Sequence, residues 1–166
     1  PAKELQDKGV LANCHVNVLQ TNDILEFRSY AEELKWLTTD PKRMSWVAQT
    51  INDISTSGNT LILVDRISAG EILEKKIKDS VFIRGATKNM ERKEHYDEVS
   101  IAQTKVIIAT YGVAAVGINI PRIFNLVLIE PGKSFVRVIQ SIGRGIRKAE
   151  DKESVAIWDI TTVSYT

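Results

Sequence analysis

The sequence predicts an α/β domain with a mainly parallel sheet and helices on both faces, and three observations support this class. Short apolar runs alternate with helical segments of about 10 to 15 residues from position 58 onward. These runs are apolar throughout, as expected for strands that are covered on both sides. A length of 166 residues with 43% apolar side chains is also enough for one hydrophobic core.

Residues 1–57 are predicted to form a lead-in segment. Val10 to Leu19 alternates loosely like a strand, and a helix is expected to run to about Ile54. Asp40 is suited to cap this helix, because Pro41 follows it and favours the first helical position. The chain begins with Pro rather than Met, from which we expect a fragment of a longer product.

Residues 58–166 are predicted to form the domain itself. We expect strands at 60–64, 81–84, 105–110, 123–130 and 154–160. Helices are expected at 68–77, 87–102 and 134–147, with Thr87 as the N-cap of the second.

The segments that follow the strands are the places to look for a ligand, because ligands of open parallel sheets bind beyond the carboxyl ends of the strands. Four such segments are rich in Gly, hydroxyl or basic residues, namely 65–68, 84–87, 110–121 and 131–134. This composition suits phosphate contact through backbone N–H groups. The alternative is that these residues only make turns.

Several kinds of site are excluded or disfavoured. Gly132-Lys133-Ser134 is similar to the end of a Walker A loop, but the first glycine of that loop would fall at Val127 and Pro131 lacks an N–H group. One Cys and two His provide neither a disulfide nor a zinc site, so no metal site is predicted. No apolar run is long enough to span a membrane and no signal peptide is present, which predicts a cytoplasmic protein without a membrane partner.

The strongest functional signal is a basic segment without acids. A net charge of +1 gives no global attraction for nucleic acid, so local clusters matter. Residues 133–148 contain five basic side chains and no acidic one: Lys133, Arg137, Arg144, Arg147 and Lys148. Two arginines three residues apart suit charge on a transferring phosphoryl group. A solvated basic helix end is the alternative, and Gly143 and Gly145 argue against it.

Two weaker signals come earlier in the chain. In the segment 110–121, small residues let the backbone approach a ligand, and Asn119 is able to bond a sugar hydroxyl. Arg84, Lys88 and Arg92 are suited to line a phosphate backbone, although a solvated helix face gives the same pattern. The solvated-face interpretation also holds for the charged residues of the preceding helix, Glu71, Glu74, Lys75, Lys76 and Lys78.

Taken in order, these segments resemble the C-terminal RecA-like domain of superfamily 2 helicases and translocases, over about 58–159. Residues 60–65 are similar to helicase motif IV, and 82–85 with Arg92 to the next nucleic-acid-contacting segment. Residues 105–121 are similar to motif V. The segment 140–147 is similar to motif VI, QxxGRxxR, which is the most specific of the set. The resemblance implies a three-layer domain of the P-loop NTPase type.

The resemblance also implies residue roles. Arginine fingers that reach ATP on a partner domain are implied for Arg144 and Arg147, with Gln140 shaping their loop. Nucleotide contacts are implied for Gly117, Asn119 and Gly143. Nucleic-acid contacts are implied for Asp65, Arg66, Arg84, Gly85, Arg92 and Thr110.

The lead-in residues 30–43 are similar to the segment that joins the two RecA-like halves of DNA-acting members. The resemblance therefore implies the C-terminal motor half of an ATP-dependent helicase that unwinds or branch-migrates forked or branched DNA in recombination and repair, as in phage. ATP and Mg²⁺ would be bound mainly by an upstream RecA-like half of the same polypeptide, and this chain alone would be inactive.

Two alternatives remain open: an RNA helicase half, and a nucleic-acid-binding module without catalysis. A third, a free nucleotide-binding enzyme, is disfavoured because no strand is followed by GxGxxG.

Overall fold

The computed structural model describes residues 13–25, 30–115, 122–130 and 154–164. Its strands are β1 (Asn13–Leu25), β2 (Thr60–Val64), β3 (Val81–Ile83), β4 (Val106–Thr110), β5 (Asn125–Leu128) and β6 (Ser154–Ser164). Its helices are α2 (Tyr30–Thr39), α3 (Pro41–Ser55), α4 (Ile67–Lys76), α5 (Asn89–Ile101) and α6 (Tyr111–Ala115).

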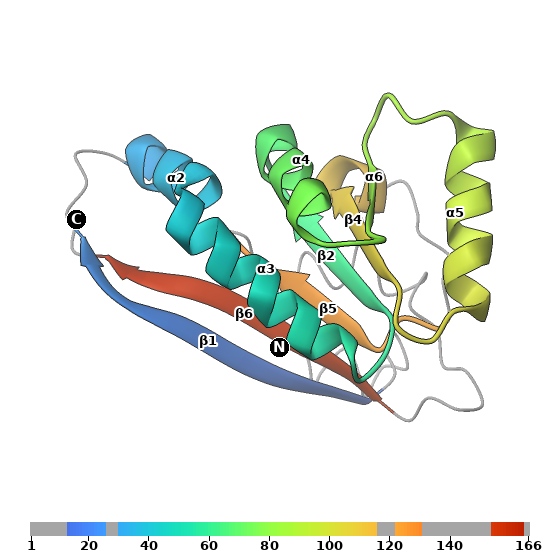
Figure 1. Ribbon diagram of the computed structural model, residues 1–166, viewed down its shortest axis with the longest axis horizontal. Coiled ribbons are helices and arrows are strands. Elements are labelled where there is room, and N and C mark those ends of the chain that lie inside the picture. The colour runs from blue at the N-terminus through green and yellow to red at the C-terminus, as the bar shows by residue number, and fades with distance from the viewer. Residues whose placement is uncertain (1–12, 26–29, 116–121, 131–153, 165–166) are drawn as a thin grey trace.

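The strands form one six-stranded sheet in the order β1-β6-β5-β2-β4-β3. Figure 1 shows this sheet from β1 to β4. Every described pair is parallel, which confirms the predicted sheet. Thr60 of β2 lies opposite Val106 of β4 on one side and Asn125 of β5 on the other. The carboxyl ends of these strands therefore meet at one edge of the sheet, which we call the carboxyl edge.

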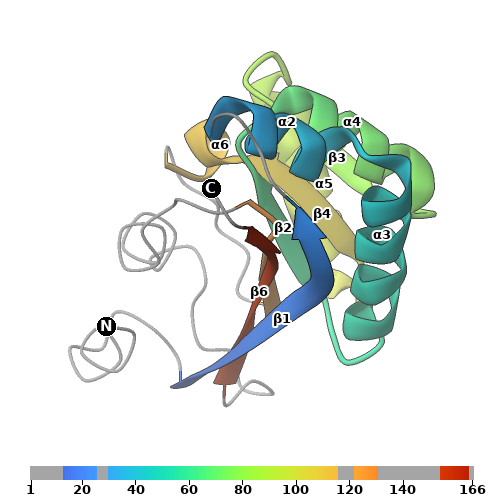
Figure 2. The same ribbon diagram turned by 90° about the vertical axis from the view of Figure 1, so that its left-hand side faces the viewer.

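Two apolar clusters, one on each face, hold helices against the sheet. In β2, Leu61 and Leu63 belong to the cluster that contains Val99 of α5 and Val113 of α6. Ile62 and Val64 belong to the opposite cluster, which contains residues of α3 and α4. Figures 1 and 2 show the resulting layers, with α3 and α4 on one face. Strands that are apolar on both sides are the sequence signature of this burial.

The segment predicted as a lead-in contributes to this core. The Asp40 carboxylate accepts a hydrogen bond from the backbone N–H of Arg43 at 2.9 Å, which confirms the predicted N-cap of α3. Met44, Val47 and Ile51 of α3 are fully buried, and each contributes about 1.5–3 kcal/mol through removal of apolar surface from water. β1 pairs with β6 along its length (Figure 1). The segment thus supplies one strand and one covering helix.

Two buried asparagines organise the opposite, amino-terminal edge of the sheet. The Asn59 amide donates to the carbonyls of Val99, Ala102 and Arg122 and accepts from the backbone N–H of Lys105. The side-chain amide oxygen of Asn125 accepts from the Trp158 indole N–H at 3.1 Å. Because Asn59 ties the ends of three connections together, it fixes the start of β2.

Local signals gave some boundaries wrongly. Thr87 does not cap α5, which begins at Asn89 after Lys88. The Thr87 hydroxyl accepts instead from the backbone N–H of Arg84, at 3.1 Å. The strand predicted at 10–19 lies at Asn13–Leu25, because its pairing with β6 extends it. The connection after β4 begins with the short helix α6, which was not predicted.

Among the described residues, none of the helices has the length and apolarity that crossing a membrane requires.

Candidate functional site

The carboxyl edge brings together residues from four separate segments. Asp65 directly follows β2, and Arg84 directly follows β3. Thr110 is the last residue of β4, and Glu130 lies two positions after the end of β5. Because all four strands run parallel, these residues lie at one edge although they are up to 65 positions apart. The structure therefore places the described nucleic-acid candidates at the edge where ligands of such sheets bind.

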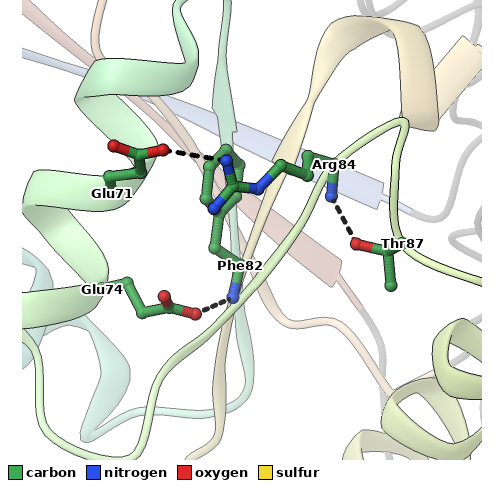
Figure 3. Close-up of polar contacts among 5 residues, drawn as sticks. All are labelled: Glu71, Glu74, Phe82, Arg84 and Thr87. Atoms are coloured by element: carbon green, nitrogen blue, oxygen red, sulfur yellow. Dashed lines mark hydrogen bonds and ion pairs between the residues drawn. The ribbon is translucent and has the colours of Figure 1, made fainter.

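The turn after β3 holds Arg84 in a defined position (Figure 3). The Arg84 guanidinium forms an ion pair with Glu71 of α4, with 2.8 Å between Nη1 and Oε1. The same guanidinium lies over the Phe82 ring, 5.2 Å from its centroid. The backbone N–H of Arg84 donates to the Thr87 hydroxyl, so both the main chain and the side chain are anchored.

Close packing of α4 on β3 makes this arrangement possible. A Cβ atom added to Gly70 would lie 2.3 Å from the tip of the Phe82 ring, so only glycine fits there without a shift. The Glu74 carboxylate accepts from the backbone N–H of Phe82 at 2.7 Å (Figure 3). Gly70 and Glu74 therefore set the distance at which Glu71 meets Arg84.

Arg92 of α5 folds back on the same turn. Its Nη2 donates to the carbonyl oxygens of Arg84 at 3.1 Å and of Gly85 at 3.0 Å. Gly85 itself is exposed, and a Cβ atom added there would meet nothing within 4 Å. Arg92 thus fixes the shape of the turn, while Gly85 leaves its backbone open to a large ligand.

Carboxylates and a tyrosine lie at the centre of the carboxyl edge. Glu130 is 3% exposed and accepts from the backbone N–H of Asp65 at 2.5 Å. The pKa of Tyr111 is raised above its usual value, first by burial and then by the negative charges of Glu130, Asp65 and Asp159. Burial also raises the pKa of Asp159. Tyr111 therefore remains a neutral phenol at physiological pH.

Thr110 and Arg66 lie at the starts of two helices. The Thr110 hydroxyl accepts from the backbone N–H of Val113 at 3.3 Å, and so caps α6. Arg66 is the N-cap residue of α4 but makes no side-chain capping bond, and its side chain is half-buried. The basic side chain of Arg66 therefore stands beside the amino end of α4.

A buried arginine at this edge was missed by sequence reasoning. Arg43 of α3 is 3% exposed, and its guanidinium donates to the carbonyls of Ile129 at 3.1 Å and Ile160 at 3.4 Å. Its position four residues before Val47 and eight before Ile51 places it on the buried face of α3. That spacing was the available signal.

The predicted catalytic and nucleotide residues lie outside the described part of the chain. They are Gln140, Gly143, Arg144 and Arg147 of the basic segment, and Gly117 and Asn119 of the connection after β4. Their roles stay predictions. In the described ranges, no group of three or more His, Cys, Asp or Glu side chains is arranged to hold a metal ion.

Comparison with known proteins defines the class. Residues 42–149 match the helicase conserved C-terminal domain family. The chain therefore belongs to this family and is a C-terminal RecA-like domain of the superfamily 2 helicase type, as its resemblance in motif order predicted.

Particular relatives come from viruses. The chain is 28% identical to the ATP-dependent DNA helicase uvsW of Enterobacteria phage T4 over 141 residues, which cover 82% of this chain and 28% of the relative. It is 31% identical to putative helicase 22 of Sulfolobus islandicus filamentous virus (isolate Iceland/Hveragerdi) over 104 residues, covering 60% of this chain and 18% of that protein. The chain thus spans less than a third of each curated relative.

Solved structures agree on the fold. The crystal structure of T4 UvsW matches 92% of this chain and 32% of its own, with a TM-score of 0.73 and 23% identity. The E. coli DEAD-box protein SrmB, solved bound to regulator of ribonuclease activity A, matches 92% of this chain and 78% of its own, with a TM-score of 0.60 and 14% identity. These likenesses confirm the predicted RecA-like architecture.

Proposed function

We propose that this chain is the C-terminal motor half of an ATP-dependent DNA helicase or translocase that unwinds or branch-migrates forked or branched DNA in recombination and repair. Membership in the helicase C-terminal family, together with the Arg84 turn at the carboxyl edge, carries the proposal. The relative uvsW is described as an ATP-dependent DNA helicase, which favours DNA over RNA. Such an enzyme acts where its DNA lies, which for a phage protein is the cytoplasm of the host cell.

In this proposal the carboxyl edge contacts the nucleic-acid backbone. Arg84 offers a charged fork, and Gly85 lets a phosphate approach the main chain. Arg66 adds a second positive charge beside the amino end of α4, where backbone N–H groups favour anions. Thr110 contributes a hydroxyl, and Asp65 fixes the backbone at the end of β2 through Glu130. Contacts of this kind read backbone charge and shape rather than base sequence.

ATP and Mg²⁺ are proposed to bind mainly on an upstream RecA-like half. The sequence holds no complete Walker A loop, because Val127 stands where the first glycine of that loop would be and Pro131 lacks an N–H group, so the main phosphate-binding loop is proposed to come from the upstream half. The arginine pair Arg144 and Arg147, with Gln140 and Gly143, would reach that nucleotide from this half, and Gly117 and Asn119 would contact its sugar or phosphates. Arginine fingers stabilise the charge that develops on the transferred phosphoryl group.

The test is ATP hydrolysis by this chain alone and joined to the polypeptide encoded upstream, each with and without forked DNA. We expect turnover only in the combination, and stimulation by forked DNA above that by an RNA duplex of equal length. Turnover by the chain alone, or none in a folded combination that binds DNA, would contradict the proposal.

The arginine-finger assignment has its own test in the combined enzyme. Arg144→Ala or Arg147→Ala should lower ATP turnover by about 10³-fold or more, because the transition-state charge loses its partner. DNA affinity measured without nucleotide should change little. Full turnover in either variant would refute the assignment.

A further inference from the structure

We propose that Glu71 competes with nucleic-acid phosphate for the Arg84 guanidinium, and so limits how tightly the carboxyl edge holds DNA. This inference rests on the proposed function, in which Arg84 contacts the nucleic-acid backbone. It gives a specific role to an acid that sequence analysis interpreted as part of a solvated face.

The contact has the chemistry of the complex that it would oppose. A Glu71 carboxylate oxygen lies 2.8 Å from Arg84 Nη1, the distance and charge that a phosphate oxygen would have there. The two side chains are 37% exposed for Arg84 and 46% exposed for Glu71. An anion from solution can therefore reach the guanidinium without unfolding anything.

Contacts other than the Glu71 ion pair also anchor Arg84 (Figure 3). The Phe82 ring supports the guanidinium from below, and the Thr87 hydroxyl fixes the Arg84 backbone. Arg92 donates to the two successive carbonyl oxygens of Arg84 and Gly85. Because the turn is anchored independently of Glu71, loss of the ion pair leaves Arg84 at the same edge.

The sign of the effect follows from charge. Arginine has five N–H donors, and among the described residues the Arg84 guanidinium donates only to Glu71. A phosphate either displaces the carboxylate or binds beside it at a repulsive distance of a few ångströms. In both cases Glu71 weakens DNA binding. Exposed ion pairs alter such equilibria by about two- to fivefold.

A moderate affinity for the nucleic-acid backbone suits a motor protein that moves along a strand. Changes in affinity at one interface appear mainly in the dissociation rate. Because the Glu71 carboxylate is part of the same chain and always lies beside Arg84, it shortens the lifetime of each phosphate contact without help from another molecule. Glu71 would therefore favour release of the backbone over retention.

The experiment measures binding of fluorescently labelled forked DNA by anisotropy, without nucleotide and at several KCl concentrations, with the full polypeptide that carries this chain. The variants are Glu71→Gln, Glu71→Ala, Arg84→Gln and the Glu71→Gln/Arg84→Gln double variant. Gln keeps an acceptor oxygen for Arg84 and removes only the charge. Asp53→Asn is the matched control, because it removes an equal charge from an exposed site near the end of α3, at the opposite edge of the sheet.

Glu71→Gln should tighten binding about two- to fivefold at low salt, and the gain should shrink as salt screens the charge. Asp53→Asn should give less, and in the Arg84→Gln background Glu71→Gln should give no more than Asp53→Asn does. If Glu71 only stabilised the turn, replacing it would weaken DNA binding. A gain in affinity therefore distinguishes competition from a structural role of Glu71. If Glu71→Ala tightens binding as much as Glu71→Gln, competition is supported over positioning.

The failures are distinguishable. If Arg84→Gln leaves DNA affinity unchanged in a folded protein, the proposed nucleic-acid contact is wrong and the competition falls with it. If Arg84→Gln weakens binding but Glu71→Gln weakens it too or leaves it unchanged, the nucleic-acid contact stands and the competition is overturned.

Discussion

Gly70→Ala tests whether close packing of α4 on β3 builds the Arg84 turn. The added methyl would lie 2.3 Å from one Phe82 ring atom and 2.6 Å from two others, and the ring is only 7% exposed. Relief of this contact requires a shift of about an ångström, for which overpacking costs of up to about 3 kcal/mol are known. The gain in helix propensity on replacing glycine by alanine is about 1 kcal/mol. We expect a net loss of about 2 kcal/mol.

Urea unfolding followed by circular dichroism measures this loss, and the midpoint of thermal unfolding should fall by about 4–8 °C. Gly112→Ala is the matched control, because an added Cβ would lie 4.0 Å from the Thr110 hydroxyl and meet nothing closer. Combining Gly70→Ala with Phe82→Leu should recover part of the loss, because the smaller side chain makes room. An increase in stability with Gly70→Ala would show that propensity dominates and that the packing argument is wrong.

Further predictions concern the turn, the amino-terminal edge and pH. Arg92→Gln should weaken DNA binding without changing its salt dependence, because Arg92 bonds two carbonyls; a slope lower by about one in a log–log salt titration would indicate a phosphate contact instead. Asn59→Ala removes four hydrogen bonds of a buried side chain and should cost about 2–5 kcal/mol in urea unfolding, and a cost below about 1 kcal/mol would contradict this. Because burial raises the pKa of Asp159, the folded state retains its proton to higher pH than the unfolded state does. Asp159→Asn should therefore stabilise the protein at neutral pH, and this gain should vanish as the pH falls below the unfolded pKa of about 3.8; a gain independent of pH would refute it.

The sequence predicted the elements whose signals are local. The strand at 60–64 has the bounds that its apolar run indicated, and α3 begins where Asp40 and Pro41 place it. Both signals depend on a few neighbouring residues, so the predicted boundaries do not depend on contacts with distant parts of the chain. The alternation of apolar strands with helices then predicted the class of fold, because parallel strands that are buried on both faces need two helical layers.

The candidate site was only partly predictable. Its position followed from the fold, because residues after parallel strands meet at one edge. The partners did not follow, because Arg84 meets Glu71 across 13 positions and Arg43 reaches Ile160 across 117. Thr87 was misassigned for a different reason: its partner is local, but its hydroxyl accepts from the backbone N–H of Arg84 in the turn before α5 and makes no bond to the helix itself.

The burial of α3 has a consequence for where this polypeptide can be shortened. A chain that started at position 58 would lack the helix covering Ile62, Val64 and Val127, and that uncovered apolar surface would promote aggregation. It would also lack the Arg43 cation that the carbonyls of Ile129 and Ile160 accept from. The smallest piece that keeps this apolar surface covered should therefore begin before Asp40, well upstream of the first helicase motif.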